Sequence, residues 1–468
     1  MSINIIENIK KQYAAEGGYK EFFLIAIPLI LSTGINSVQL FINRTFLSWY
    51  SKEAFAASVP ASIANFAILS LFLGTLAYVD VFVAQYYGKK EYRSIGPAVW
   101  QSVYLALGAA FIIFCLSFFA ESFFMGIGHP TEVAREEGVF FKVLCYGAFF
   151  TLAGAALAGF YAGRGKTKVV LFVSLFGVIM NVILDILLIF GNLGFPRMGI
   201  VGSAIASMIS SCLMLIVSVI LVTSKKNNEI FNTRKLTPNF DFIKRLFKYG
   251  FPNGCQFFFD MAGFSIFILL IGTLGVNELA ASNIALNINH LAMMPVVGCG
   301  MTTSILVGKY LGQNRPSISQ SSVRSSSEII YVYLIIVTAA LLLFPKQLIY
   351  PFVSGGHMQQ IGQTEQMAIH VLRILAAYMV FDGTNVIFAA AIKGAGDTAF
   401  VMRVLVILSI VMVIIPTYLI VIVFQLGLYA AWWFMLLYVA ALAGIFFARY
   451  KSNKWKKMRV IEMDISEN

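Results

Sequence analysis

Two long stretches of this chain, 224 positions apart, carry the same pattern of residues without a gap. Pro28 corresponds to Pro252, and Asn65 corresponds to Asn289. The same shift pairs eight further residues of the first stretch with identical residues of the second: Ala56, Ala57, Ser58, Ala61, Gly74, Val83, Tyr86 and Gly88. Each copy holds two apolar segments long enough to cross a bilayer, which takes ~20 residues of helix. The repeat therefore predicts a duplicated membrane unit.

The composition supports a membrane protein and argues against a soluble one. Hydrophobic residues make up 59% of the 468 residues, charged residues make up 12%, and the mean hydropathy is +0.82. Soluble domains carry about 25% charge. The net charge of +12 is confined to particular loops, so it does not indicate nucleic-acid binding. The five cysteines lie in or beside apolar segments without metal-ligand spacing, and we expect them to be packing residues.

We expect an all-α polytopic protein with twelve transmembrane helices in two six-helix lobes. The predicted spans are 21–44, 54–86, 96–119, 134–162, 168–190, 199–223, 246–271, 279–310, 327–345, 364–391, 401–424 and 427–449. The predicted lobes are residues 1–223 and 246–468, joined by a polar linker at 224–245. An even number of spans in each half gives both copies the same orientation, so a pseudo-two-fold axis along the membrane normal should relate them.

Basic residues gather in alternate loops, which predicts the orientation of the chain. One side collects most of them: Lys10, Lys11, Lys20, Lys89, Lys90, Arg93, Arg164, Lys166, Lys168, the linker, Arg315, Arg324, Lys393 and the tail KSNKWKKMR. The other side has little beyond Lys52, Arg135, Arg197 and Lys346. By the positive-inside rule, both termini should be cytoplasmic in the plasma or bacterial inner membrane. The amino-terminal residues lack the order of a signal peptide.

Two acids lie deep in predicted spans of the second half. Asp260 is surrounded by apolar residues, and Asp382 follows Tyr378 by one helical turn on the same face. A charge at that depth costs at least ~2.5–3.5 kcal/mol, so we expect both acids to face a cavity and act in transport. The alternative is an interhelical hydrogen bond. By the repeat, their first-half counterparts are Asn36 and Thr151.

Other polar residues in the spans leave more alternatives open. Asn181 and Asp185 share one face of the fifth span. They are either a functional pair or polar residues that hold neighbouring helices together. Arg44 and Asp80 are expected to pair with each other rather than to act in transport. Asn287 in the eighth span offers an amide oxygen. His290 and His370 are expected to pack rather than to ligate.

Longer motifs resemble the multidrug and toxic compound extrusion family. They include Gly250-x-Pro252 followed after eight residues by Asp260, then LAASNIALNINHL and GCGMTTSILVGKYLG. Asp382 precedes IKGAGD at the family's spacing, and NVILDILLIFGNLGFPRMGIVGSAIAS matches the fifth and sixth helices. The resemblance covers nearly the whole chain. It implies a V-shaped, twelve-helix transporter with a central cavity that exports organic compounds against a cation.

The resemblance also assigns roles to single residues. Asp260 matches the seventh-helix acid of NorM-like members, Asp382 matches their tenth-helix acid, and Tyr378 matches an aromatic neighbour. The amino-lobe polar cluster corresponds to Asn181, Asp185, Ser203 and Asn43. Asn43 is a departure, because family members carry an acid at its place, here followed by Arg44. The amide of Asn43 cannot take up a proton near neutral pH. This argues against a proton-binding site on the first helix.

These features favour an antiporter that exports amphipathic, cationic organic compounds by alternating access. Sodium is favoured as the coupling ion, held by Asp260 and Asp382 with Tyr378 and Asn287 as neighbours. Proton coupling through the amino-lobe cluster is the runner-up. A lipid-linked precursor flippase of the same superfamily and a channel are the rival readings. We expect neither enzymatic activity nor a cofactor, and we expect a monomer whose partners are small molecules and lipids, not nucleic acid.

Overall fold

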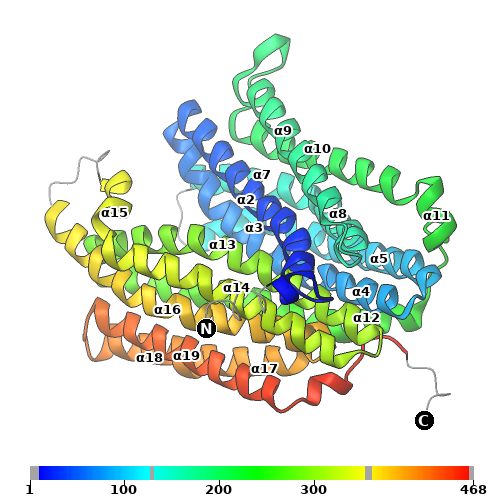
Figure 1. Ribbon diagram of the computed structural model, residues 1–468. Coiled ribbons are helices and arrows are strands. Elements are labelled where there is room, and N and C mark those ends of the chain that lie inside the picture. Colours follow the sequence, from blue (N-terminus) through cyan, green and yellow to red (C-terminus); the bar gives the residue numbers. More distant parts are fainter. Residues whose placement is uncertain (1–9, 127–130, 354–360, 463–468) are drawn as a thin grey trace. The chain divides into compact units, whose positions relative to one another are not determined.

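The structure, a computed structural model, describes residues 10–126, 131–353 and 361–462, and every regular element in those ranges is helical (Figure 1). The helices of the first half are α2 (Tyr19–Tyr50), α3 (Lys52–Ala77), α4 (Val79–Lys89), α5 (Tyr92–Ser117), α6 (Ala120–Gly126), α7 (Thr131–Tyr146), α8 (Ala148–Ala162), α9 (Thr167–Phe190), α10 (Gly199–Val222) and α11 (Lys225–Phe231). Those of the second half are α12 (Phe240–Gly272), α13 (Val276–Gly312), α14 (Pro316–Leu343), α15 (Pro345–Val353), α16 (Ile361–Ala395), α17 (Thr398–Leu408), α18 (Ile415–Tyr418) and α19 (Leu428–Lys451).

The number of membrane spans agrees with the prediction. Within the described residues, eleven helices are long and apolar enough to cross a membrane. A twelfth span is formed if Val133–Tyr146 and Ala148–Ala162, which are bent by 40° at Gly147, are counted together. The expectation of an all-α polytopic fold with twelve helices is therefore confirmed.

The predicted linker is more ordered than its polar composition suggested. It contains the short helix α11, and α12 already begins at Phe240, inside the range 224–245. Asn239 caps this start, because its side-chain oxygen accepts a hydrogen bond from the Phe242 amide at 3.0 Å. A capping asparagine satisfies one of the amides that a helix start leaves unpaired. The cap explains how a helix can begin well before the apolar span.

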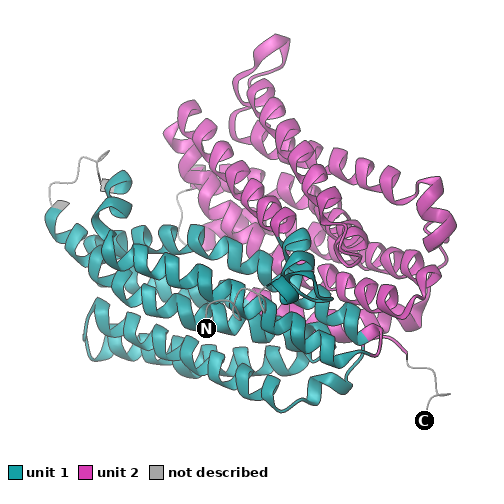
Figure 2. Cartoon of the chain, in the orientation of Figure 1, with its two compact units in different colours: residues 1–26, 259–311, 315–459 teal, residues 27–258, 312–314, 460–468 magenta. Residues whose placement is uncertain are grey.

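The contacts divide the chain into two compact units (Figure 2). Unit 1 comprises residues 1–26, 259–311 and 315–459, and unit 2 comprises residues 27–258, 312–314 and 460–468. Two membrane helices are divided between the units, because α2 changes unit after Ala26 and α12 changes unit after Phe258. The predicted lobes, residues 1–223 and 246–468, were defined by the sequence repeat and not by contacts. The division into these two lobes stays a prediction.

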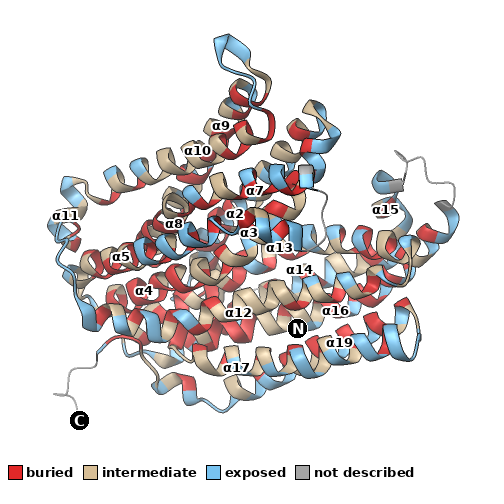
Figure 3. Cartoon of the chain, turned by 180° about the vertical axis from the view of Figure 1, so that it is seen from behind, coloured by how far each residue is buried: buried red, intermediate tan, exposed pale blue. Residues whose placement is uncertain are grey.

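Unit 2 is held together by close helix crossings and a core of aromatic and small residues. A Cβ atom on Gly74 of α3 would lie 2.8 Å from the Cα of Gly254 in α12, so these helices meet without side chains between them. Phe82 and Phe160 are fully buried in the core of the unit. Large apolar side chains elsewhere are exposed, such as Phe111 at 68% and Leu269 at 72%. Figure 3 colours the ribbon by burial and shows exposed segments along many of the helices. Exposed apolar surface of this kind suits a hydrocarbon solvent.

Arg164, in the loop between α8 and α9, is a structural cation of unit 2. Its guanidinium carbon lies 3.7 Å from the centre of the Phe160 ring and 4.3 Å from that of Phe231. Its Nε donates a hydrogen bond to the Phe160 carbonyl at 2.8 Å. Burial lowers the pKa of Arg164 to about 10, so it stays charged at neutral pH. Stacking on aromatic faces accounts for a buried guanidinium at this position.

Candidate functional site

The two acids of the second half are both within electrostatic range of the same pair of tyrosines in unit 1. Asp260 projects from α12 and Asp382 from α16, and both carboxylates act electrostatically on the phenol groups of Tyr378 and Tyr438. Tyr378 is buried. The structure thus brings together three of the four residues that the sequence predicted for a second-half cation site.

Further polar groups in this cluster were not predicted from the sequence. Asn385 donates a hydrogen bond to Asp382 Oδ1 at 3.4 Å, and the hydroxyls of Ser409 and Tyr438 are 2.9 Å apart in a buried position. The signal for Asn385 was its place three residues after Asp382 on the same helical face. Tyr438 lies in α19, and its sequence context holds no indication of these neighbours.

Asn287 is the fourth predicted residue, and its hydrogen bond lies within its own helix, α13. Its amide donates a hydrogen bond to the Asn283 carbonyl at 2.8 Å, one turn earlier on α13, and the residue is exposed. A bond within its own helix satisfies this donor. The role of Asn287 in cation binding stays a prediction.

The amino-half cluster lies within unit 2 and joins four predicted residues. Asn181 and Asp185 of α9 are fully buried. When the Asn43 amide nitrogen faces its acceptors, it donates to Asn181 Oδ1 at 2.8 Å and to Asp185 Oδ2 at 2.8 Å. Ser203 of α10 donates a hydrogen bond to the Asp185 carboxylate. Side chains from α2 and α10 therefore meet the carboxyl group of Asp185, and Asn181 joins them from one turn earlier on α9.

Asp185 is incompletely satisfied by this cluster. Its Oδ1 is buried and has no hydrogen-bond partner among the described residues. Asn181 turns its amide nitrogen instead to Ser207, at 3.4 Å from the hydroxyl. An unpaired oxygen on a buried carboxyl group favours a bound proton or cation. Ser207 was not predicted, although it follows Ser203 by one turn of α10.

A cavity of about 240 Å³ opens beside this cluster in unit 2. Helices α2, α3, α7 and α10 supply its walls, and the lining residues are Asn36, Gln39, Leu40, Asn43, Arg44, Leu47, Ser58, Ser62, Phe140, Leu144, Ser203 and Ser207. Amides, hydroxyls and one guanidinium share the lining with aliphatic and aromatic side chains. Such a mixture can accommodate an amphipathic molecule.

The predicted pair of Arg44 and Asp80 is wrong. Arg44 lines the cavity with Ser62, in the first half of the span that α3 and α4 form together. Asp80 lies at the start of α4, where a Cβ on Gly163 would collide with its carbonyl oxygen. Ser62 and Asp80 are about 18 residues apart, which is about 27 Å at the rise of an α-helix. An ion pair across that distance is impossible.

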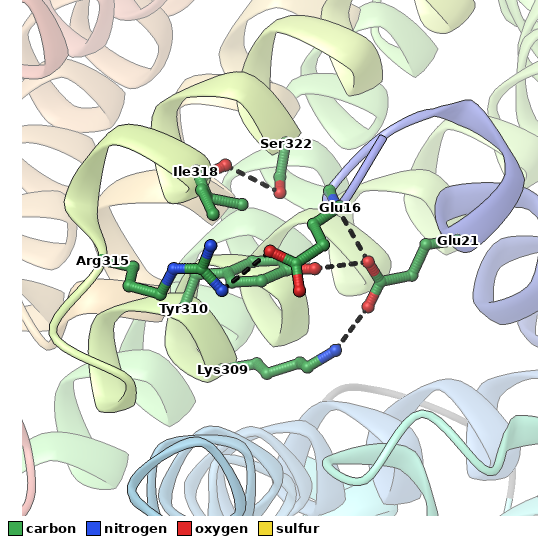
Figure 4. Close-up of polar contacts among 8 residues, drawn as sticks. Glu16, Glu21, Lys309, Tyr310, Arg315, Ile318 and Ser322 are labelled. Atoms are coloured by element: carbon green, nitrogen blue, oxygen red, sulfur yellow. Dashed lines mark hydrogen bonds and ion pairs between the residues drawn. The ribbon is translucent and has the colours of Figure 1, made fainter. Parts of the chain in front are cut away.

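A second polar cluster of unit 1 lies at the start of α2 and was not predicted from the sequence (Figure 4). Glu21 accepts hydrogen bonds from Lys309 Nζ at 2.6 Å, from the Tyr310 hydroxyl at 2.5 Å and from the Gly17 amide at 2.9 Å. Beside it, Arg315 pairs with Glu16 at 2.7 Å. These bonds attach the amino-terminal segment to the end of α13. We regard the cluster as structural, because each charge in it has a partner of opposite sign.

Comparison with known proteins places this fold. The sequence profile of the MatE family matches residues 28–187 and 252–419, two ranges that begin 224 positions apart, as the repeat predicts. A probable multidrug resistance protein NorM of Bacillus cereus is 30% identical over 300 residues, which are 63% of this chain and 66% of that protein. The corresponding protein of Thermotoga maritima is 24% identical over 451 residues, which are 94% of each chain.

Solved structures agree with the sequence comparison. The outward-facing structure of a multidrug resistance MATE family transporter of the MOP superfamily superposes with a TM-score of 0.84. The superposition covers 94% of this chain and 97% of that one at 20% identity, so it supports the fold alone. The two family matches together cover well over half of the 468 residues. The chain therefore belongs to the MatE family, whose members are membrane transporters and not enzymes.

Proposed function

We propose that this protein is a cation-coupled antiporter that exports amphipathic organic cations by alternating access. The observation that carries the proposal is the pair of acids, Asp260 and Asp382, which act electrostatically on the same two tyrosines within the spans. Two carboxylates at one apolar site repel each other and require a proton or a counter-cation. Cargo and coupling ion can then compete for the same negative charge, which makes their movements opposite.

Sodium is our first choice of coupling ion. Carboxylate, hydroxyl and amide oxygens are hard ligands that suit such a cation, and the second-half cluster offers all three, from Asp382, Tyr438 and Asn385. The site needs no further acid, since neutral oxygens can complete the coordination. We place the protein in the plasma or bacterial inner membrane with both termini in the cytoplasm, and we expect it to act as a monomer.

Protons are the alternative, and one observation favours them. The buried Asp185 Oδ1 has no hydrogen-bond partner among the described residues, as expected for a carboxyl group that binds a proton. Asn43 leaves this site with one acid fewer than the family pattern, so Asp185 would have to carry the proton by itself.

Efflux from proteoliposomes tests the proposal. A sodium gradient and a pH gradient are imposed separately, and export of a cationic dye is measured for the native protein and for Asp260→Asn, Asp382→Asn and Asp185→Asn. We expect the sodium gradient to drive export, and each second-half substitution to abolish that coupling. Asp241→Asn is the matched control, because Asp241 lies on the same helix as Asp260 but is exposed. Coupling that survives both second-half substitutions and fails in Asp185→Asn would assign the site to the amino half.

A further inference from the structure

Arg44 is a cation for which the proposed transport cycle has no use. It lies in α2, is half-buried, and lines the cavity of unit 2. No carboxylate whose side chain the structure describes forms an ion pair with it. The buried acid of the neighbouring cluster, Asp185, is bound by Asn43, the residue before Arg44. A partly desolvated guanidinium without a counter-ion is costly, and an anion from outside the protein would relieve that cost.

The rest of the cavity suits an anion of one particular kind. Its polar lining consists of amides and hydroxyls, which include Asn36, Gln39, Ser58 and Ser62, and none of the described residues that line it is acidic. Apolar side chains, with Leu40 and Phe140 among them, form the rest of the lining. A planar guanidinium binds a carboxylate through two parallel hydrogen bonds, and neighbouring amides and hydroxyls can donate further ones.

The volume indicates how much of a ligand fits. At about 240 Å³ the cavity is smaller than the ~300–1,000 Å³ of sites that enclose a whole drug-sized molecule. A carboxylate attached to one aromatic ring is a group of suitable size. A pyrophosphate would bring several negative charges to a cavity in which, among the described lining residues, Arg44 carries the single positive charge and the others are neutral.

We propose that Arg44 binds the carboxylate of an amphipathic organic cargo in this cavity. The inference rests on the proposed export function and narrows its substrate class, from organic cations in general to compounds that carry a carboxylate together with a basic group. Arg44 then acts as a specificity residue. Its guanidinium binds cargo that has an anionic end and repels cargo whose cationic group enters this cavity first.

Two dyes that differ in one group provide the test. A zwitterionic rhodamine with a free benzoate and the methyl ester of the same dye share their ring system, but only the first has a carboxylate. Binding to the purified full-length protein in lipid nanodiscs is followed by fluorescence polarisation, without any ion gradient. We expect the native protein to bind the acid more tightly than the ester. Arg44→Gln and Arg44→Met should weaken acid binding about tenfold to a hundredfold, the range for hydrogen bonds to a charged group, and leave ester binding within about twofold.

The control is Arg135→Gln, because Arg135 is an exposed arginine of the same unit that lines a separate cavity. It should change the affinity for neither dye. Equal affinity of the native protein for acid and ester, or an equal loss of both dyes in the two Arg44 variants, would overturn the proposal. Unchanged ester binding shows that a variant is folded.

Binding and transport separate this inference from the proposed function. If the dyes are discriminated through Arg44 but no imposed gradient drives their export, then the antiport proposal fails and the carboxylate site stands. If export is coupled to a cation while Arg44→Gln leaves the preference for acid over ester unchanged, then the carboxylate site fails and the antiport proposal stands.

Discussion

Asn43 is the residue at which this chain differs most from the pattern it otherwise resembles, and the structure gives it a defined task. Its amide nitrogen is 2.8 Å from both Asn181 Oδ1 and Asp185 Oδ2. Asn43→Ala removes this donor from a buried carboxyl group, so we expect a loss of about 1–3 kcal/mol of stability. Thermal unfolding in detergent measures it. Thr45→Ala is the control, since the Thr45 hydroxyl donates its hydrogen bond to the Phe41 carbonyl on the same helix. An Asn43→Ala midpoint as high as that of the control would contradict the assignment.

Single residues were predictable where a helix alone decides their position. Asn181 and Asp185 were paired from their spacing of four, and they do lie together. Arg44 and Asp80 were paired only because both are charges in apolar segments, and the structure separates them. The neighbours of a charge on another helix depend on tertiary packing. The sequence contains little information about that packing without the fold.

At the level of the elements, helix crossings contribute to stability, and α3 crosses α12 closely through Gly74 and Gly254. A Cβ on Gly254 would collide with the Leu71 carbonyl and the Thr75 hydroxyl. Gly254→Ala should therefore cost about 1–3 kcal/mol, as overpacking does. Gly108 lies in the interior of α5 with no atom within 4 Å of its Cβ position, so Gly108→Ala should stabilise the helix by up to about 1 kcal/mol. The midpoints of thermal unfolding of Gly254→Ala and Gly108→Ala measure the difference. Equal midpoints would show that α3 and α12 can move apart to accept the added methyl group.

The elements themselves were the most predictable part of the molecule. Apolar segments of this length can only be membrane helices, so the spans followed from composition alone. Their ends did not, because polar turns that continue a helix into water carry no hydropathy signal. The start of α12 at Phe240 is such a case, since the cap at Asn239 decides it. Residues 134–162 were likewise predicted as one continuous span, but the helix bends by 40° at Gly147 between α7 and α8.

For the whole molecule, the short segment after α19 is part of the packing of unit 2. Val460 is 2% exposed, Ile461 is 6% exposed, and the Val460 amide donates to Gln85 Oε1 at 2.9 Å. A chain that ends at Arg459 should lose about 2–4 kcal/mol relative to one that ends at Glu462, chiefly from the two buried side chains. Thermal unfolding and trypsin digestion in nanodiscs report the difference. Identical behaviour of the two chains would show that the segment only rests on the surface.

The division of α2 and α12 between the units has a consequence for biosynthesis. The ribosome makes residues 1–26 first, but the remainder of unit 1 begins only at residue 259. Glu21 therefore enters the membrane long before Lys309 and Tyr310 exist to bind it. Unit 2 in turn gains Val460, which is made after nearly all of unit 1 and binds Gln85. Neither unit can therefore be completed during synthesis until the segments after residue 259 have been made.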